Sequence, residues 1–581
     1  MFLFTILYFY ICRDKTNLLT KVNAIFMKKI YLIICFITIS LVALAQEERI
    51  IHVETAGTLN TFINDADKYN ITKLTVTGKL NGNDFILLRD MAGAKGVNSL
   101  TDGQLTELDL SGVDIVTSDD VYFSYANQNY KTADNVFGSF LMYNSKKLTT
   151  LKLPESIVEI GTQALSGCSN LSEIDIPESV TSIGSGVFLL CDAIKKIVVP
   201  DNVTTLGIGA FQRMGGLEEI YFGSGLTALE ASLLVLDNSL KLIHIGKNIE
   251  SIDPVILYTL PALETLTVDN DNSNYSALDG VLFNKDKSVL VCYPCAKVEE
   301  GYVIPPTVEE LGSNCFANVY GMQSLTIPSY VKTIGEGVFS GCVMSEIILE
   351  DGVESIGYGA FANTVNLVTI DIPASVNELF PGAFQYAVSL MKINVDENNE
   401  NYASDNGILY SKDKAVLIAF PAGCTDEVYT TEPSVTEIAE LAFSSNMYLK
   451  TIKLNNNIQT VGDMAFSECA ELNEVYCYPE NLTDVAELAF VSEKLMDGGT
   501  LYVPKGRVDF YLSQPWVYNA EYNTYLFSNV EEMSDEAAAV ETVTSGEKVK
   551  EIYSIDGRRL QNMQRGINIL RQDGRIVKIV K

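Results

Sequence analysis

The sequence predicts an α/β-to-mainly-β solenoid, in which short coils of chain stack side by side and their strands form a parallel β-sheet. Three observations predict it. A unit of about 23 residues recurs through the central part of the chain, each unit contains a short alternation of apolar and polar residues, and two similar insertions interrupt the series 127 residues apart. One unit cannot bury its apolar face alone, whereas stacked neighbours can, so the repetition itself indicates a solenoid.

Residues 27–45 have the features of a secretory signal peptide. Two lysines precede the apolar run YLIICFITISLVALA, which ends in a small-x-small pattern, so cleavage is expected between Ala45 and Gln46. The run is too short and wrongly flanked for a stable membrane span. The mature protein is therefore expected to be secreted or at the cell surface. Residues 1–26 are interpreted as a start site assigned too early, and the alternative is an N-terminal membrane anchor.

The charge of the chain excludes several classes of partner. The formal net charge is −33, and removal of residues 1–45 takes away five basic residues and one acidic residue, leaving −37. Such a chain repels nucleic acid and anionic membranes, since affinity for phosphate needs Lys and Arg. The two histidines, His52 and His244, lie far apart in the sequence, so a His-containing triad or a His-rich metal site is not expected. No catalytic residue, metal or cofactor is predicted.

Residues 46–135 predict an N-terminal capping region with helices. The order is strand, helix and strand over residues 50–80, then a second helix at NDFILLRDMAG and a further strand at LTELDLSG. Leu74 and Leu108 are 34 residues apart, which indicates longer units than those that follow. A cap is needed because the open end of a solenoid is an apolar, unpaired edge.

Residues 136–504 carry the repeat itself. The unit is L-x-x-I-x-I-P-x-x-V-x-x-I-G-x-x-A-F-x-x-C-x-x, and one of its positions falls at Ile160, Ile183 and Leu206. The I-x-I stretch predicts a short strand with one buried face. Proline ends that strand because it cannot donate to a ladder, glycine permits the turn, and the A-F pair fills the end of the coil.

Two insertions, at about residues 269–304 and 396–431, interrupt the repeat. NSNYSALDGVLFNKDKSVLVCYP in the first matches NENYASDNGILYSKDKAVLIAFP in the second. Each has a Gly-containing turn, a strand, a Lys-Asp-Lys turn and another strand, which predicts a β-hairpin projecting from the edge of the solenoid.

The C-terminal part is expected to hold three short segments. Residues 505–535 predict a cap with a short helix, and the acidic, Ala-rich residues 536–548 predict a linker. Residues 549–581 predict a small basic β unit that is similar to C-terminal sorting domains of secreted bacterial proteins. The alternative is a simple capping sheet.

On the repeat and the Asp-Gly-Val-Leu-Phe…Lys-Asp-Lys insertion, the chain resembles the BspA-type leucine-rich repeat family of bacterial surface proteins. The resemblance covers roughly residues 137–504. It implies adhesion to a host or microbial surface protein or to a glycan, and it brings no catalytic residues. The repeats around Leu234 and Leu257 lack the Phe and the Cys, so local distortion is expected there.

The strand residues that face out of the sheet are the candidate binding residues. Tyr221 beside His244, and Tyr476 beside Tyr502, could stack on sugars or anchor a protein partner. The alternative is an ordinary solvated face without a partner. The full column is Lys152, Asp175, Val198, Tyr221, His244, Thr267, Thr326, Ile348, Asp371, Asn394, Lys453, Tyr476 and Tyr502.

The cysteines predict little chemistry. Cys292 and Cys295 form a C-x-x-C motif, but redox or zinc chemistry would need a second thiol pair or a helix N-terminus. Cys168 and Cys191 share one register in adjacent coils, which leaves a disulfide possible. Buried core filling is the favoured interpretation of these thiols.

An aspartate- and asparagine-rich segment at residues 269–274 resembles the start of a calcium loop, and residues 396–401 repeat it. Both lack the Gly at the sixth position and the Glu at the twelfth. Asx turns explain both segments without a metal ion.

These features are consistent with three functions. The favoured hypothesis is a non-catalytic adhesin or interaction scaffold at the cell surface. The alternative is a glycan-binding accessory protein of a polysaccharide-uptake system. A glycosidase is the third, since paired carboxylates are its usual requirement, and no two acidic residues stand out.

Overall fold

The computed structural model describes residues 47–97, 99–299, 301–519 and 524–534 and the four strands of the C-terminal sheet. Two compact units divide the chain, residues 1–240 and residues 241–581. The predicted signal peptide with its cleavage site, residues 1–26 and the linker at 536–548 lie outside the described residues.

The first unit begins with a parallel sheet and one α-helix. β1 (Glu47–Val53), β2 (Ile71–Leu80) and β5 (Glu107–Ile115) pair in parallel, and Leu74 is the register partner of Leu108. α3 (Gly82–Met91) lies where the second helix is expected, and an Asn81–Asp84 capping box starts it. Two short antiparallel pairs of strands complete this region: β3 (Ala94–Lys95) with β4 (Ser99–Leu100), and β6 (Val121–Tyr125) with β7 (Gln128–Lys131).

The first expected helix, between β1 and β2, does not form as such. The chain makes only the 3-10 helix η1 (Leu59–Thr61) and then a series of turns. The side chain of Asn64 accepts hydrogen bonds from the backbone N–H groups of Ala66 (2.9 Å) and Asp67 (3.1 Å). Such a local bond from an asparagine side chain competes with helical hydrogen bonding, so the helix cannot continue.

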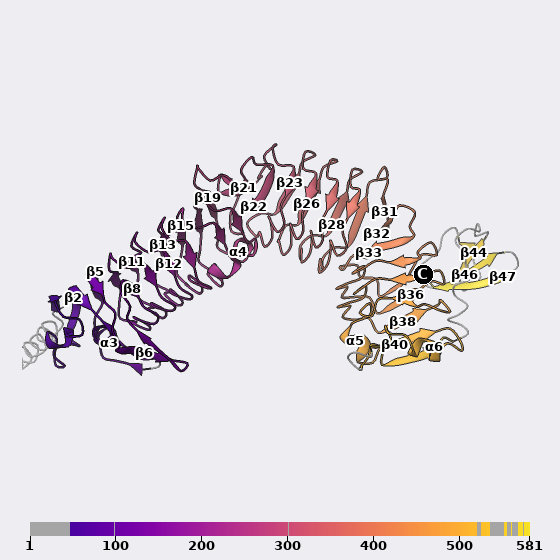
Figure 1. Ribbon diagram of the computed structural model, residues 1–581. Helices are drawn as coiled ribbons and strands as arrows, with labels where there is room; N and C mark the ends of the chain where they lie inside the picture. The colour runs from indigo at the N-terminus through magenta and orange to yellow at the C-terminus, as the bar shows by residue number, and fades with distance from the viewer. Residues whose placement is uncertain are drawn as a thin grey trace, which may run out of the picture. The chain divides into compact units, whose positions relative to one another are not determined.

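Regular coils follow in the first unit, and each contributes one strand to each of two ladders (Figure 1). The first ladder runs from β5 to β9 (Thr150–Lys152) and β11 (Glu173–Asp175), and β13 (Lys196–Val199) pairs with β15 (Glu219–Phe222). The second ladder joins β8 (Val136–Phe137), β10 (Glu159–Ile160), β12 (Ser182–Ile183) and β14 (Thr205–Leu206). The unit ends with β16 (Ala228–Leu229) and the 3-10 helix η2 (Ala231–Leu234).

The second unit repeats this plan in two arrays. It starts with β17 (Leu242–Ile245), β18 (Ser251–Ile252), α4 (Val255–Tyr258) and β19 (Thr265–Val268). The strands of the first array are β23 (Glu310–Leu311), β24 (Ser324–Ile327), β25 (Thr333–Ile334), β26 (Glu346–Leu349), β27 (Ser355–Ile356), β28 (Thr369–Ile372), β29 (Glu378–Leu379) and β30 (Lys392–Val395). Those of the second are β34 (Val428–Thr430), β35 (Glu437–Ile438), β36 (Thr451–Leu454), β37 (Thr460–Val461), β38 (Glu474–Cys477), β39 (Asp484–Val485) and β40 (Thr500–Val503).

The two insertions are three-stranded and belong to the sheet rather than projecting from it. The first forms β20 (Tyr275–Leu278), β21 (Val281–Asn284) and β22 (Val289–Cys292), and β22 pairs in parallel with β23. The second forms β31 (Tyr402–Asp405), β32 (Ile408–Ser411) and β33 (Val416–Ala419), and β33 pairs with β35. The expectation of a projecting hairpin is thus corrected, because the side chains of Val281, Phe283 and Leu290 are fully buried against the coils.

The C-terminal part of the second unit has three short strands that the sequence does not predict. After α5 (Glu493–Met496) and β40 come α6 (Val508–Leu512), β41 (Tyr518–Asn519) and β42 (Thr524–Tyr525). β43 (Asn529–Glu532) then pairs in parallel with β40. A separate antiparallel sheet has the order β45 (Arg559–Leu560), β44 (Glu551–Ser554), β46 (Ile567–Gln572) and β47 (Arg575–Val580).

The core of each array is a stack of phenylalanine rings. Phe188 and Phe211 stack in the first unit with ring centroids 5.7 Å apart. In the second unit, one stack runs Phe316, Phe339, Phe361 and Phe384, and another runs Phe420, Phe443, Phe466 and Phe490. The repeated A-F position therefore lies inside the coils, as the repeat predicts. The degenerate repeats differ: Leu234 ends η2 and Leu257 lies in α4, and both side chains are buried.

The repeated glycine after the second strand of each coil is required because the backbones of adjacent coils lie close together there. An unusual φ is not the reason. A Cβ atom on Gly184 would lie 2.6 Å from the backbone nitrogen of Thr162 in the preceding coil. Coils that stack at the spacing of strands in a sheet leave no room for a side chain at this position.

Candidate functional site

The exposed column of strand residues is best formed on the sheet β34-β36-β38-β40-β43 of the second unit. Along each strand, apolar residues point into the core and the intervening residues point out, as the period of two requires. Lys453, Tyr476 and Tyr502 are successive register partners, so they lie side by side on the outer face.

Tyr476 and Tyr502 form a parallel stack. Their ring centroids are 4.5 Å apart and the ring planes differ by 19°. The ammonium group of Lys453 lies 5.3 Å from the centroid of the Tyr476 ring. Partial burial raises the pKa of both phenols, so both hydroxyl groups stay protonated and can donate. Tyr476 thus meets a cation and another ring, while ring edges and hydroxyl groups remain for a partner.

Two further residues extend this column beyond the predicted set. Thr430 is the register partner of Lys453, and Glu531 is the register partner of Tyr502. Sequence reasoning missed Glu531 because residues 505–535 were expected to form only a cap. The alternation in Asn529-Val530-Glu531-Glu532 is the signal that could have identified the strand. We call Thr430, Lys453, Tyr476, Tyr502 and Glu531 the tyrosine column.

In the first unit, the predicted column lines a groove. Lys152, Asp175 and Val198 lie on the outer faces of β9, β11 and β13, along a groove of about 710 Å³. The groove lies where β11 ends one sheet and β13 begins the next. Lys152 pairs with Asp109 at 3.0 Å, so the floor of the groove is polar and partly neutralised.

Tyr221 and His244 lie in different units, Tyr221 in the first and His244 in the second. The ammonium group of Lys196 lies 4.4 Å from the centroid of the Tyr221 ring, and the Tyr221 hydroxyl donates to Glu219 (3.1 Å). His244 Nδ1 is 3.0 Å from Thr267 Oγ1. Burial lowers the pKa of His244, and the nearby carboxylate of Asp269 opposes this effect, so the ring is neutral at pH 7. A joint role for Tyr221 and His244 stays a prediction.

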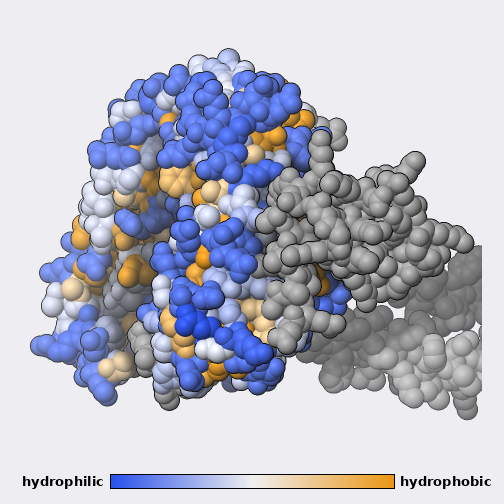
Figure 2. Space-filling model, turned by 90° about the vertical axis from the view of Figure 1, so that its right-hand side faces the viewer, coloured by the Kyte–Doolittle hydropathy of each residue, from blue (hydrophilic) through white to orange (hydrophobic). Residues whose placement is uncertain are grey.

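The other column positions are exposed or half-buried and chemically mixed. Thr267 lies on β19, and the remaining members lie on the outer face of four strands of the first array in the second unit, namely Thr326, Ile348, Asp371 and Asn394. Because the residue type changes from strand to strand, these positions do not form a regular array that could bind the same chemical group repeatedly. Among the visible residues in Figure 2, most of the surface is hydrophilic, with hydrophobic side chains in small separate patches.

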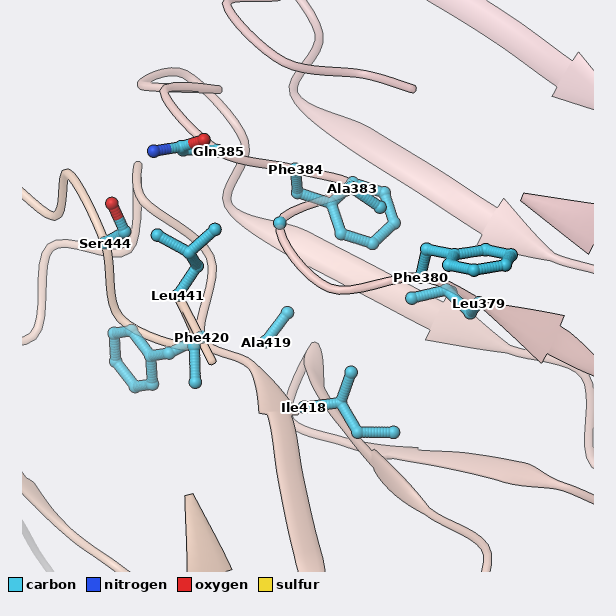
Figure 3. Close-up of a pocket in the computed structure, with 12 residues that line it drawn as sticks. Leu379, Phe380, Ala383, Phe384, Gln385, Ile418, Ala419, Phe420, Leu441 and Ser444 are labelled. Carbon is cyan, nitrogen blue, oxygen red and sulfur yellow. The ribbon is translucent and has the colours of Figure 1, made fainter. Parts of the chain in front are cut away.

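A small apolar pocket lies between the two arrays of the second unit. Phe384 at the end of one ring stack and Phe420 at the start of the next lie on its two sides, with Ala419 and Leu441 between them (Figure 3). Its lining offers only two polar side chains, Gln385 and Ser444. The lining holds no histidine, carboxylate, lysine or thiol that could activate the Ser444 hydroxyl as a nucleophile.

The described cysteines are free, and nearly all are buried. The thiols of Cys168 and Cys191 donate to backbone carbonyls 26 residues earlier in the chain, those of Met142 and Leu165, at 3.2 Å each. Burial raises the pKa of the Cys295 thiol to about 11 and that of Cys292 well above its usual value. Because thiolates carry thiol chemistry, the C-x-x-C motif is unsuited to redox exchange at neutral pH.

In each calcium-like segment, a lysine and an asparagine side chain hydrogen-bond backbone groups. The ammonium group of Lys285 donates to the backbone carbonyls of Asn270 (3.2 Å) and Asn272. The buried Asn272 side chain donates to the carbonyls of Gly246 (2.8 Å) and Ile249 (3.1 Å) and accepts from two backbone N–H groups. The second segment repeats this arrangement with Lys412 and Asn399.

Asp237 has the kind of pKa shift that often marks an acid catalyst. Burial raises the pKa of its carboxyl group to about 7. The side chain is completely buried, however, and its Oδ1 accepts a hydrogen bond from the backbone N–H of Met214 (2.6 Å). A substrate cannot reach it, so the shift reflects packing rather than catalysis.

In the part of the chain that the structure describes, no three His, Cys, Asp or Glu residues come together as metal ligands, and no helix is long and apolar enough for a membrane span.

Comparison with known proteins gives a family and a set of similar folds. The family model "BspA type Leucine rich repeat region" matches six times, over residues 135–274, 292–410 and 419–498, which is more than half of the chain. None of the curated proteins matches.

Several solved structures are similar at low identity. The pneumococcal vaccine antigen PcpA is 18% identical, with 67% of this chain and 80% of that chain covered and a TM-score of 0.39. A leucine-rich cell surface protein from Faecalibacterium prausnitzii is 21% identical, with 63% and 87% covered and a TM-score of 0.31. A leucine-rich repeat protein from Bacteroides ovatus is 18% identical, with 71% and 90% covered and a TM-score of 0.29. On the match of the family model, the chain belongs to the BspA-type leucine-rich repeat family.

Proposed function

We propose that this protein is a non-catalytic binding protein, secreted or held at the cell surface, that uses the tyrosine column to bind a host or microbial surface protein. The single observation that supports it is the aligned column on five paired strands. It places an ammonium group, two phenols and a carboxylate in register at the strand spacing of about 4.8 Å. Tyrosine and charged groups held on a rigid sheet are typical of protein interfaces.

The ring geometry favours a protein over a glycan at this face. A sugar ring stacks on the open face of an aromatic ring, but Tyr502 lies against one face of Tyr476 and Lys453 lies over the ring. Ring edges and hydroxyl groups instead suit hydrogen bonds and edge contacts with a protein surface.

The test is a binding screen with matched variants. The chain is passed over an array of host matrix and serum proteins and over a glycan array, and the double variant Tyr476→Ala, Tyr502→Ala is compared with it. We expect binding to a protein that weakens at least tenfold in the double variant. The control Tyr448→Ala removes another exposed tyrosine of the second unit, 43% exposed, and should bind as the unchanged chain does. Equal affinity of the double variant would remove the tyrosine column from the proposal.

A second candidate is a glycan-binding accessory protein of a polysaccharide-uptake system. The exposed Tyr125 and the half-buried Tyr130 on the β6–β7 hairpin of the first unit favour it, since both meet Phe140 at a tilt and do not stack in parallel as Tyr476 and Tyr502 do. Binding to the glycan array that survives the loss of Tyr476 and Tyr502 would support this second function.

A further inference from the structure

The β6–β7 hairpin carries an aromatic surface that lies outside the tyrosine column. β6 lies beside α3 in the first unit (Figure 1). Phe123 of the hairpin stacks on Phe140 of the following coil, with ring centroids 5.0 Å apart and planes 9° apart, and both rings are nearly buried. Three tyrosines surround this pair: Tyr125, Tyr130 and Tyr143. We call these three residues the tyrosine platform.

The platform rings are tilted, so no parallel ring covers their faces. Tyr125, Tyr130 and Tyr143 meet Phe140 at interplanar angles of 45°, 59° and 63°, with centroids 5.0–5.6 Å apart. Tyr125 is 48% exposed. Tyr130 and Tyr143 are half-buried, so part of each of the three rings is open to solvent. Unlike Tyr476 and Tyr502, whose planes differ by 19°, the platform tyrosines do not stack in parallel on another tyrosine.

Uncharged amides border the platform. Residues 121–130 contain no charged side chain, in a chain with a net charge of −33. Gln128 Oε1 accepts from the Tyr130 hydroxyl (3.0 Å) and Asn129 Oδ1 accepts from Ser124 (2.7 Å), so both carbonyl ends are fixed and both NH₂ groups are left as donors. The adjacent Asn127, at the turn of the hairpin with φ 64°, is exposed as well.

A buried arginine holds the platform in place. Arg89 of α3 is 4% exposed, and its guanidinium donates to the backbone carbonyls of Tyr122 in β6 (2.7 Å) and Leu141 (3.1 Å) and lies 5.1 Å from the Phe123 ring centroid. No carboxylate pairs with Arg89 among the described side chains. Burial of a cation without a paired carboxylate costs free energy. The guanidinium of Arg89 instead bonds carbonyl groups of the hairpin strand and of the coil that contains Phe140. A surface fixed in this way loses little conformational entropy on binding.

From this geometry we infer that the tyrosine platform is a binding site for a neutral oligosaccharide or polysaccharide. The C–H face of a pyranose ring packs on an open aromatic face, and the amides of the hairpin turn hydrogen-bond its hydroxyl groups. A neutral glycan fits better than an anionic one because the acidic chain repels polyanions. This site is independent of the tyrosine column.

Affinity electrophoresis tests the site. The full chain is run in native gels that contain starch, xylan, β-glucan, mannan or galactomannan, and in a gel with polygalacturonate as the anionic probe. We expect retardation in at least one neutral gel and none in the polygalacturonate gel. The double variant Tyr125→Ala, Tyr130→Ala should show at least a tenfold weaker affinity, whereas Tyr130→Phe, which keeps the ring, should still bind.

The controls separate this site from the tyrosine column and from loss of folding. Tyr476→Ala should be retarded as the unchanged chain is, so failure of one proposal is distinguishable from failure of the other. If circular dichroism shows that the double variant is unfolded, Tyr125→Ala decides alone, since its ring is half exposed. The inference is overturned if no neutral gel retards the chain, if the platform variants bind normally, or if the platform variants lose binding only to a protein.

Discussion

At the scale of single residues, one position of the repeat is occupied by different types of side chain in successive coils. This position is occupied at steps of 23 by Ser145, Cys168, Cys191, Met214 and Asp237. Cys168 and Cys191 donate to a carbonyl of the preceding coil, whereas Asp237 accepts from the backbone N–H of Met214. Asp237 Oδ2 has no hydrogen-bond partner among the described atoms, so its ionised form is poorly solvated.

Asp237→Asn should raise stability at neutral and alkaline pH. Because burial raises the pKa of Asp237 to about 7, the folded chain holds the proton more tightly than the unfolded chain does. This group therefore stabilises the fold below about pH 4, and the contribution is lost as the pH rises to about 7. We expect the free energy of unfolding of the variant to exceed that of the unchanged chain by roughly 1–4 kcal/mol at pH 8, and by much less at pH 4.

Urea unfolding at several pH values measures this difference. Asp175→Asn, on the exposed face of β11, is the matched control and should give a curve parallel to that of the unchanged chain. A difference for Asp237→Asn that does not grow between pH 4 and pH 7 would contradict the prediction.

The candidate site could be predicted in part at this scale. The period of the repeat places Tyr476 and Tyr502 on one face of the sheet, because residues in register on parallel strands are neighbours. Whether their rings would stack on each other or stay open to a ligand depends on side-chain rotamers, which the spacing does not specify. The bonds of Lys285 to the Asn270 and Asn272 carbonyls are likewise invisible in the sequence, since Lys285 lies in the turn after β21, 13 to 15 residues further along the chain.

At the scale of elements, the insertions start new ladders in the second unit. β20, β21 and β22 precede β23 in one seven-stranded sheet, and β31, β32 and β33 precede β35 in a six-stranded sheet. Each insertion therefore covers the open edge of the array that follows it, which is the role of a cap at the end of a solenoid. The stack of phenylalanines then continues through each array.

Phe339→Ala should destabilise the second unit strongly. Phe339 is fully buried between Phe316 and Phe361, with ring centroids 5.7 Å and 5.4 Å away. Removal of a buried phenylalanine ring costs about 3–5 kcal/mol, because the lost transfer energy adds to the cost of the cavity. We expect the urea midpoint followed by circular dichroism to fall accordingly.

Phe380→Ala is the control for this prediction. The Phe380 side chain is 43% exposed, so its removal should cost under about 1 kcal/mol. Similar midpoints for the two variants would show that the ring stack is not a principal source of stability.

At the scale of the whole molecule, the charge is the dominant physical property. The chain has 74 acidic and 41 basic side chains, and the ion pairs that the structure describes are mostly at the surface. Surface pairs contribute little to stability, whereas the excess of negative charge opposes the compact state.

Salt should therefore stabilise the protein. Raising NaCl from about 0.01 M to about 0.5 M shortens the Debye length from about 30 Å to under 5 Å and screens the repulsion. We expect the thermal midpoint to rise by several degrees, with KCl giving the same rise because the effect is not specific to an ion. A falling midpoint would mean that ion pairs outweigh the repulsion.

The sequence by itself determined the class of fold, the repeat, the buried phenylalanine position and the column of outward-facing residues. These features follow from a local periodicity that recurs in every coil. Only the stacking of coils can bury the apolar residues that this periodicity places on one face. The tertiary structure alone decided that the insertions enter the sheet, that β43 adds a strand beyond the last repeat, and that Arg89 joins α3 to the β6–β7 hairpin. The pairing of β43 and the bonds of Arg89 each occur once, so they leave no period in the sequence. The insertions do recur, but their repetition does not specify whether a hairpin projects from the sheet or pairs with it.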